Sequence, residues 1–156
     1  MDMGTQAAAA RVAQRWSAGL AVVLLVQAAG GFFWPGLYRD NLWVRTVFVG
    51  TDFFTLVLIL PLLLWALWQS RRASPRGRLV LNGVLYYVFY TNVYYLFSAF
   101  NRFFLVYVAV AVLSLGALIA SLLATDAEAL AGIAQRVARR AVAAVLLGSA
   151  AILAVM

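Results

Sequence analysis

Asp52 is the one acid inside a long apolar segment of the chain. It lies within residues 46–68, which are otherwise uncharged and are long enough to cross a bilayer. A carboxylate placed in hydrocarbon costs about 2.5–3.5 kcal/mol on insertion scales, so such residues usually bind an ion, move a proton or join helices. Residue type and position together mark Asp52 as the first candidate for chemistry.

Asn92 is expected at the same depth as Asp52. Each lies about six residues, or roughly 9 Å, from the outer end of its span. Hydroxyl groups of Tyr90, Thr55 and Tyr107 enter the same half of the bundle. This pattern predicts a small polar and aromatic pocket, open to the outer side, that binds a small ligand, a lipid or a proton. The alternative is a structural clamp, because such side chains also join helices by hydrogen bonds.

Two arginines could decide the state of Asp52. Arg45 precedes it by seven residues, about two helical turns, and Arg102 lies in the outer turn after the span that contains Asn92. If either guanidinium reaches Asp52, the carboxylate is fixed in an ion pair. If neither does, Asp52 is free to take up a proton.

The composition removes most other chemistries. The 156 residues are 66% hydrophobic and 11% charged, and all twelve basic residues are arginine. The sequence contains no cysteine, histidine or lysine, which excludes thiolate chemistry, ordinary zinc, haem or iron–sulfur ligation, and Schiff bases. No phosphate-binding glycine loop is present. We expect no cofactor and no metal, and enzymatic catalysis is the least supported class because no second carboxylate or nucleophile–base pair accompanies Asp52.

The expected fold follows from the apolar stretches, which are residues 16–34, 46–68, 79–98, 103–124 and 141–156. The first four are close to the roughly 20 residues that cross a bilayer, and the shorter fifth either crosses or lies against the bundle. The pattern predicts an all-α, single-domain bundle of five transmembrane helices. Residues 126–140 are expected to form an interfacial amphipathic helix before the last span. Pro61 removes a backbone hydrogen bond and predicts a kink, either static or a hinge.

The arginines also predict the orientation of the spans. Nine fall on the side of the N-terminus if every stretch crosses, and only Arg39, Arg45 and Arg102 fall on the other. The positive-inside rule then makes the N-terminus cytoplasmic, together with a basic loop made of Arg71, Arg72, Arg76 and Arg78. The net charge of +7 is therefore read as a signal for orientation and for anionic lipid headgroups on the cytoplasmic side, rather than for nucleic acid.

Two segments carry a resemblance to other proteins. LYRDNLWVRTVFVGTDFFTLVLILPLLL and RGRLVLNGVLYYVFYTNVYYLFSAFNRFFLVYVA present, in order, an acid, a proline, an Arg-Gly turn, a Tyr/Asn run and a Phe-Asn turn. In this order they resemble a group of uncharacterised bacterial multi-pass membrane proteins over spans two to four. The resemblance implies a location in the bacterial inner membrane and no particular activity.

Two classes of function fit these observations. The first is a non-enzymatic membrane protein that binds a small ligand, lipid or proton from the outer side, as a component of a transporter or channel or as a homo-oligomer. The second is an accessory subunit of a larger membrane complex, in which the polar cluster around Asp52 and Asn92 clamps the helices. A pocket enclosed by one chain favours the first class, and a lipid-facing surface built for a partner favours the second.

Overall fold

The computed structural model describes residues 3–72 and 74–125, which belong to one unit, Met1–Thr125. The regular elements within these ranges are α1 (Met3–Phe33), α2 (Leu42–Phe54), the π-helical turn η1 (Thr55–Ile59), α3 (Leu60–Arg71), α4 (Pro75–Leu96) and α5 (Phe104–Leu123). The expected all-helical class is confirmed for this part of the chain. The interfacial helix expected at 126–140 and the fifth span expected at 141–156 lie outside the described residues.

Three helices of the described unit are long and apolar enough to cross a membrane. They are Gly4–Phe33, Leu42–Arg71 and Phe104–Leu123. The second is built from α2, η1 and α3, which follow one another without a break. These three match the stretches expected at 16–34, 46–68 and 103–124. The first helix extends much further toward the N-terminus because its early residues include the alanine run at 7–10, and alanine is the strongest helix former.

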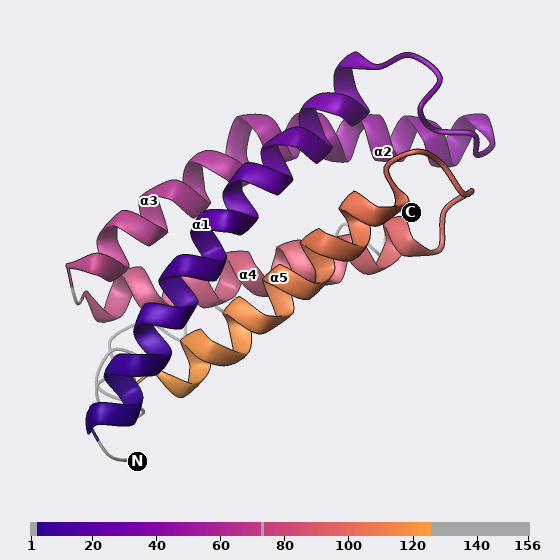
Figure 1. Cartoon of the computed structure of the whole chain (residues 1–156). Helices are drawn as coiled ribbons and strands as arrows, with labels where there is room; N and C mark the ends of the chain where they lie inside the picture. Colours follow the sequence, from indigo (N-terminus) through magenta and orange to yellow (C-terminus); the bar gives the residue numbers. More distant parts are fainter. Residues whose placement is uncertain (1–2, 73, 126–156) are drawn as a thin grey trace, which may run out of the picture. The chain divides into compact units, whose positions relative to one another are not determined.

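Helix α4 has the length of a span but a more polar composition. Its 22 residues include five tyrosines and two asparagines, within PRGRLVLNGVLYYVFYTNVYYL. Figure 1 shows α4 running beside α5 in the opposite direction, from the turn after α3 to the loop before α5. That loop lies at the same end of the unit as the α1–α2 loop, and we refer to it as the loop end. The N-terminus lies at the opposite end (Figure 1).

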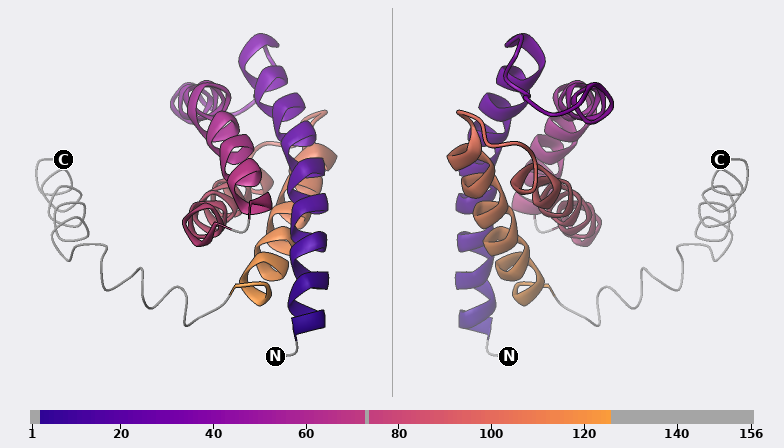
Figure 2. Two further views of the ribbon diagram at one scale, coloured as in Figure 1. Left: turned by 90° about the vertical axis from the view of Figure 1, so that its left-hand side faces the viewer. Right: turned by 90° about the vertical axis from the view of Figure 1, so that its right-hand side faces the viewer.

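The unit consists of α1, the continuous helix made of α2, η1 and α3, and helices α4 and α5, which pack against one another in a ring. Helix α1 contacts α5, α5 contacts α4, and α4 contacts α3, while α1 also contacts α2 and α3. Figure 2 shows α1 and α5 side by side, with α3 and α4 beside them. Helices α1 and α5 approach so closely that a Cβ atom added to Gly116 would overlap the ring of Trp16. The main core contains fully buried residues from four helices, including Leu20, Leu63, Leu85 and Val110.

Pro61 is accommodated by the π-helical turn that precedes it. The backbone N–H of Leu60 donates to the carbonyl oxygen of Thr55, five residues earlier, and Pro61 stands in the first turn of α3. A wider turn changes the carbonyl positions just where a proline cannot donate a hydrogen bond. The hinge role of Pro61 stays a prediction.

Candidate functional site

Each oxygen of the Asp52 carboxylate accepts a hydrogen bond within the described unit. Asp52 is 1% exposed. The Tyr38 hydroxyl donates to its Oδ2 atom, and the Tyr95 hydroxyl donates to its Oδ1 atom at 3.0 Å. The Tyr95 hydroxyl also lies 3.4 Å from the carbonyl oxygen of Phe48. Hydrogen bonds to a carboxylate are stronger than neutral ones, so both oxygens are held firmly in place.

Three separate segments supply these groups. Tyr38 lies in the α1–α2 loop, Asp52 in α2, and Tyr95 in the last turn of α4. Aromatic rings pack around the bonds: the ring centroids of Phe48 and Tyr95 are 4.6 Å apart in a stacked geometry, and those of Tyr95 and Tyr107 are 5.2 Å apart. We refer to Tyr38, Phe48, Asp52, Tyr95 and Tyr107 as the Asp52 cluster. It joins the α1–α2 loop to α2, α4 and α5 at the loop end.

Helix α1 closes the cluster through Gly31. A Cβ atom added at this position would lie 2.6 Å from Cγ of Asp52, and closer still to Oδ2 of Asp52 and the hydroxyl of Tyr38. Only a residue without a side chain lets the α1 backbone come this near. The carboxylate is therefore covered by helix backbone, which removes it from water and strengthens its hydrogen bonds.

Tyr38 lies in the α1–α2 loop rather than in a helix, and its environment keeps it protonated. Burial raises the pKa of Tyr38 above its ordinary value, and the nearby Tyr95 and Asp52 raise it further. The phenol therefore remains a hydrogen-bond donor at neutral pH.

Asn92 is buried, but its hydrogen bond goes to the α4 backbone rather than to Asp52. Its Nδ2 atom donates to the carbonyl oxygen of Val88 at 2.9 Å, and its Oδ1 atom has no hydrogen-bond partner among the described residues. The α4 side chain at the Asp52 carboxylate is Tyr95, about one turn beyond Asn92. Thr55 is buried as well and begins the π-helical turn.

The two predicted tyrosines take opposite positions. Tyr107 is 1% exposed and belongs to the Asp52 cluster, where its hydroxyl has no partner among the described residues. Tyr90 is 50% exposed and lies outside the cluster. Its hydroxyl is 2.7 Å from that of Tyr94, and its ring stacks on Tyr86. Tyr90 therefore belongs to an outward-facing row on α4.

The predicted ion-pair partners of Asp52 are both exposed. The Arg102 guanidinium lies 5.9 Å from the ring centroid of Trp34, and Arg45 is on the surface of α2. Tyrosine hydroxyls occupy both oxygens of Asp52 within the described unit. The carboxylate is thus bonded to neutral donors.

The basic loop around the α3–α4 turn has two anchored arginines. Arg72 lies over Trp68, with its guanidinium carbon 3.7 Å from the ring centroid. Arg78 donates from Nη1 to the carbonyl oxygen of Ala124 at 2.7 Å, which satisfies an end carbonyl of α5. Arg71 and Arg76 are exposed.

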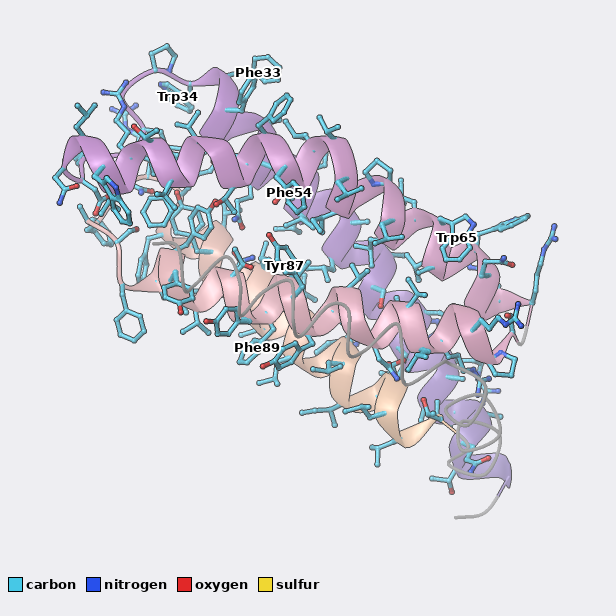
Figure 3. The ribbon with its side chains drawn as sticks, turned by 180° about the vertical axis from the view of Figure 1, so that it is seen from behind. Phe33, Trp34, Phe54, Trp65, Tyr87 and Phe89 are labelled. Carbon is cyan, nitrogen blue, oxygen red and sulfur yellow. The ribbon has the colours of Figure 1, made fainter. Side chains whose placement is uncertain are left out.

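A groove lies between α2 and α4 next to the Asp52 cluster. Its volume is about 370 Å³, and its lining is mainly apolar, with the hydroxyls of Thr51 and Thr91 and the carboxylate of Asp40. Phe48 and Tyr95 belong both to this lining and to the cluster. Figure 3 shows Phe54 and Tyr87 lying between the same two helices, with ring centroids 6.3 Å apart.

Asp40 stands at the loop end of this groove. Its Oδ1 atom accepts a hydrogen bond from the backbone N–H of Ala99 at 2.9 Å, which ties the α1–α2 loop to the α4–α5 loop. Its Oδ2 atom is buried and has no partner among the described residues.

Sequence reasoning missed Gly31, Tyr38, Phe48 and Tyr95. The two tyrosines are both buried: Tyr38 is 5% exposed and Tyr95 is 1% exposed. A signal for Tyr95 was present, because Val88, Asn92 and Tyr95 follow helical spacing and share one buried face. Tyr38 lies in an irregular loop, for which no periodicity exists.

Neither a metal-binding cluster in the described residues nor a related protein indicates the role of this chain. Within residues 3–72 and 74–125, no three His, Cys, Asp or Glu side chains come together as a metal ligand set. Comparisons with protein-family models, with curated proteins and with solved structures give no match for this chain. Its role is therefore inferred from the groove and the Asp52 cluster.

Proposed function

We propose that this chain is a non-enzymatic, multi-pass protein of the bacterial inner membrane that binds a lipid or another small hydrophobic ligand in the α2–α4 groove. The observation that carries the proposal is a shared wall: Phe48 and Tyr95 line the groove and stack on each other, and the Tyr95 hydroxyl donates to the Asp52 carboxylate. The cluster holds the two helices apart at a fixed separation, which keeps the groove open to a ligand.

The groove has the size and chemistry of a ligand site. Its volume of about 370 Å³ falls at the small end of the roughly 300–1,000 Å³ typical of ligand pockets. A mostly apolar lining suits an acyl chain or a similar group, and Asp40 lies at one end. The ligand does not touch Asp52 in this proposal, because both of its oxygens are already bonded.

In the expected orientation, with the N-terminus cytoplasmic, this groove would lie in the outer half of the membrane. If the three apolar helices cross, α4 must cross too, because it links the end of α3 to the start of α5 at the loop end. The basic α3–α4 loop then lies in the cytoplasm beside anionic headgroups, and the loop end lies outside. A fifth span at 141–156 would complete the bundle.

A second candidate is an accessory subunit of a larger membrane complex, or a homo-oligomer. The outward face of α4 carries Tyr86, Tyr90 and Tyr94, which are 59%, 50% and 54% exposed. Phenol hydroxyls in hydrocarbon require hydrogen-bond partners, and a neighbouring protein helix could supply them. This row therefore favours a partner that covers α4.

Retention of lipid tests the first candidate. Val47 lines the groove and is 45% exposed, so Val47→Trp should fill the groove; Val112, on α5 and 56% exposed, does not line it. The proteins are purified in mild detergent with added phosphatidylethanolamine and examined by native mass spectrometry. We expect Val47→Trp to lose most of the bound lipid and Val112→Trp to retain it. Equal retention by the two variants would reject the groove, and a co-purified protein lost on changing Tyr90 would favour the second candidate.

A further inference from the structure

Two of the three arginines expected on the outer side line one small pocket at the loop end. The pocket has a volume of about 190 Å³ and is formed by the two loops that meet there. Its lining residues are Trp34, Gly36, Leu37, Arg39, Asn101 and Arg102. It is separate from the groove between α2 and α4, with which it shares no lining residue.

No carboxylate of the described unit neutralises these guanidinium groups. The described residues include only two acids, Asp40 and Asp52. Asp52 is bonded to tyrosine hydroxyls, and Asp40 accepts from the backbone N–H of Ala99 on one oxygen and has no partner on the other. Two cationic residues that line one pocket and have no ion-pair partner among the described residues repel each other, so an anion bound between them is favourable.

The walls of the pocket are held in place by their own contacts. The guanidinium of Arg102 lies over the Trp34 ring, which restrains it as a cation–π pair. Asn101 is 5% exposed, and its Oδ1 atom accepts a hydrogen bond from the backbone N–H of Phe103 at 2.8 Å. Gly36 has a positive φ of 82°, which turns the loop without placing a side chain in the pocket. Arg102 and Asn101 are therefore restrained before any ligand arrives, whereas Arg39 is exposed.

We propose that this pocket binds a phosphate-type oxyanion between Arg39 and Arg102. A guanidinium group presents a planar fork of donors that matches phosphate oxygens, and two such groups provide both charge and direction. The small volume suits a single phosphate group better than an extended anion. The phosphate comes either from a lipid headgroup at the membrane surface or from free phosphate in the surrounding solution.

The experiment compares wild type, the double variant Arg39→Gln/Arg102→Gln and the control Arg45→Gln. Arg45 is the third arginine on that side and does not line the pocket. One arm measures the thermal midpoint in detergent with inorganic phosphate against chloride at equal ionic strength. The other measures, by native mass spectrometry, retention of phosphatidylglycerol against diacylglycerol with the same acyl chains. Far-ultraviolet circular dichroism confirms that each variant is folded, and Arg102→Gln alone replaces the double variant if that one does not fold.

We expect the double variant to lose binding by roughly tenfold or more, since it removes two charged donors, and Arg45→Gln to behave as wild type. Stabilisation by inorganic phosphate identifies free phosphate as the source, and selective retention of phosphatidylglycerol identifies a headgroup. If the double variant matches Arg45→Gln in both arms, the proposal is wrong. Val47→Trp should leave phosphate binding unchanged, so failure of the groove and failure of this pocket are told apart.

Discussion

The Tyr95 hydroxyl on α4 donates to Oδ1 of Asp52 on α2 at 3.0 Å, from a side chain that is itself fully buried. A tyrosine near the end of a membrane helix usually faces the interface, where its hydroxyl meets water. Here the ring instead turns inward and stacks on Phe48. The same side chain therefore satisfies the one acid of the span and forms a wall of the groove.

Removing either of the two hydroxyls that donate to Asp52 should destabilise the protein. We expect Tyr95→Phe and Tyr38→Phe each to lower the free energy of unfolding by about 1.5–3 kcal/mol, because each removes a hydrogen bond to a carboxylate. Tyr94→Phe is the matched control, since Tyr94 is on the same helix but 54% exposed. Denaturation of the purified proteins in mixed detergent micelles provides the comparison. A loss for Tyr94→Phe as large as that for Tyr95→Phe would contradict the role given to the cluster.

Substitutions of Asp52 should separate hydrogen bonding from simple packing. Asp52→Asn keeps one carbonyl oxygen and adds a donor that a tyrosine hydroxyl can accept, so we expect a moderate loss of stability. Asp52→Leu leaves the Tyr38 hydroxyl buried without its acceptor and leaves the Tyr95 hydroxyl with only the carbonyl oxygen of Phe48 at 3.4 Å, so it should cost roughly 1–3 kcal/mol more. The same denaturation assay orders the two variants. Equal stability of Asn and Leu at this position would show that the bonds contribute little.

Gly31 should tolerate no side chain. Gly31→Ala places a methyl group against the Asp52 carboxyl and the Tyr38 hydroxyl, so we expect α1 to be pushed away and stability to fall. Gly19→Ala is the control on the same helix, because no atom lies within 4 Å of its added Cβ. That change should be neutral or stabilising by about 0.5–1 kcal/mol, as for glycine in any helix interior. Comparable thermal midpoints for the two variants would exclude the close approach at Gly31.

The folded state should weaken at alkaline pH through Tyr38. The pKa of this phenol is raised in the folded state, mainly by burial, so the unfolded chain releases the proton first. Its contribution to stability is complete below the ordinary tyrosine pKa of about 10 and declines as the pH rises above it. We expect Tyr38→Phe to reduce this decline, measured as the thermal midpoint between pH 8 and pH 11. An unchanged pH dependence in Tyr38→Phe would show that another group controls it.

Cysteine labelling tests the orientation. The sequence contains no cysteine, so a single one can be read without background. We expect an impermeant thiol reagent to label Phe100→Cys, in the α4–α5 loop, in intact cells. Ser74→Cys, in the α3–α4 turn, should react only after the membrane is permeabilised. The reverse pattern would place the N-terminus outside.

Hydropathy and charge alone predicted the helical membrane class and three of the apolar spans, because these depend on length and composition. They also identified Asp52 and Tyr107 as buried polar residues. The hydrogen-bond partners of Asp52 could not be predicted in the same way. Depth along the helices pointed to Asn92, whereas the rotation of α4 and the reach of a phenol bring Tyr95 to the carboxylate. The course of the α1–α2 loop, which delivers Tyr38, depends on tertiary contacts that no local pattern records.

The π-helical turn at Thr55–Ile59 makes the fold sensitive to a change in chain length at this point. Such a turn is equivalent to an α-helix that has gained one residue, so deleting one residue within it would leave an unbroken α-helix. The residues after the deletion would then rotate by about 100° relative to Asp52, which is the angle between successive residues of an α-helix. Leu63 and Ala66 would leave the core while Asp52 kept its bonds. The extra residue therefore sets the rotation of α3 that buries Leu63 and Ala66 in the core while Asp52 faces the cluster.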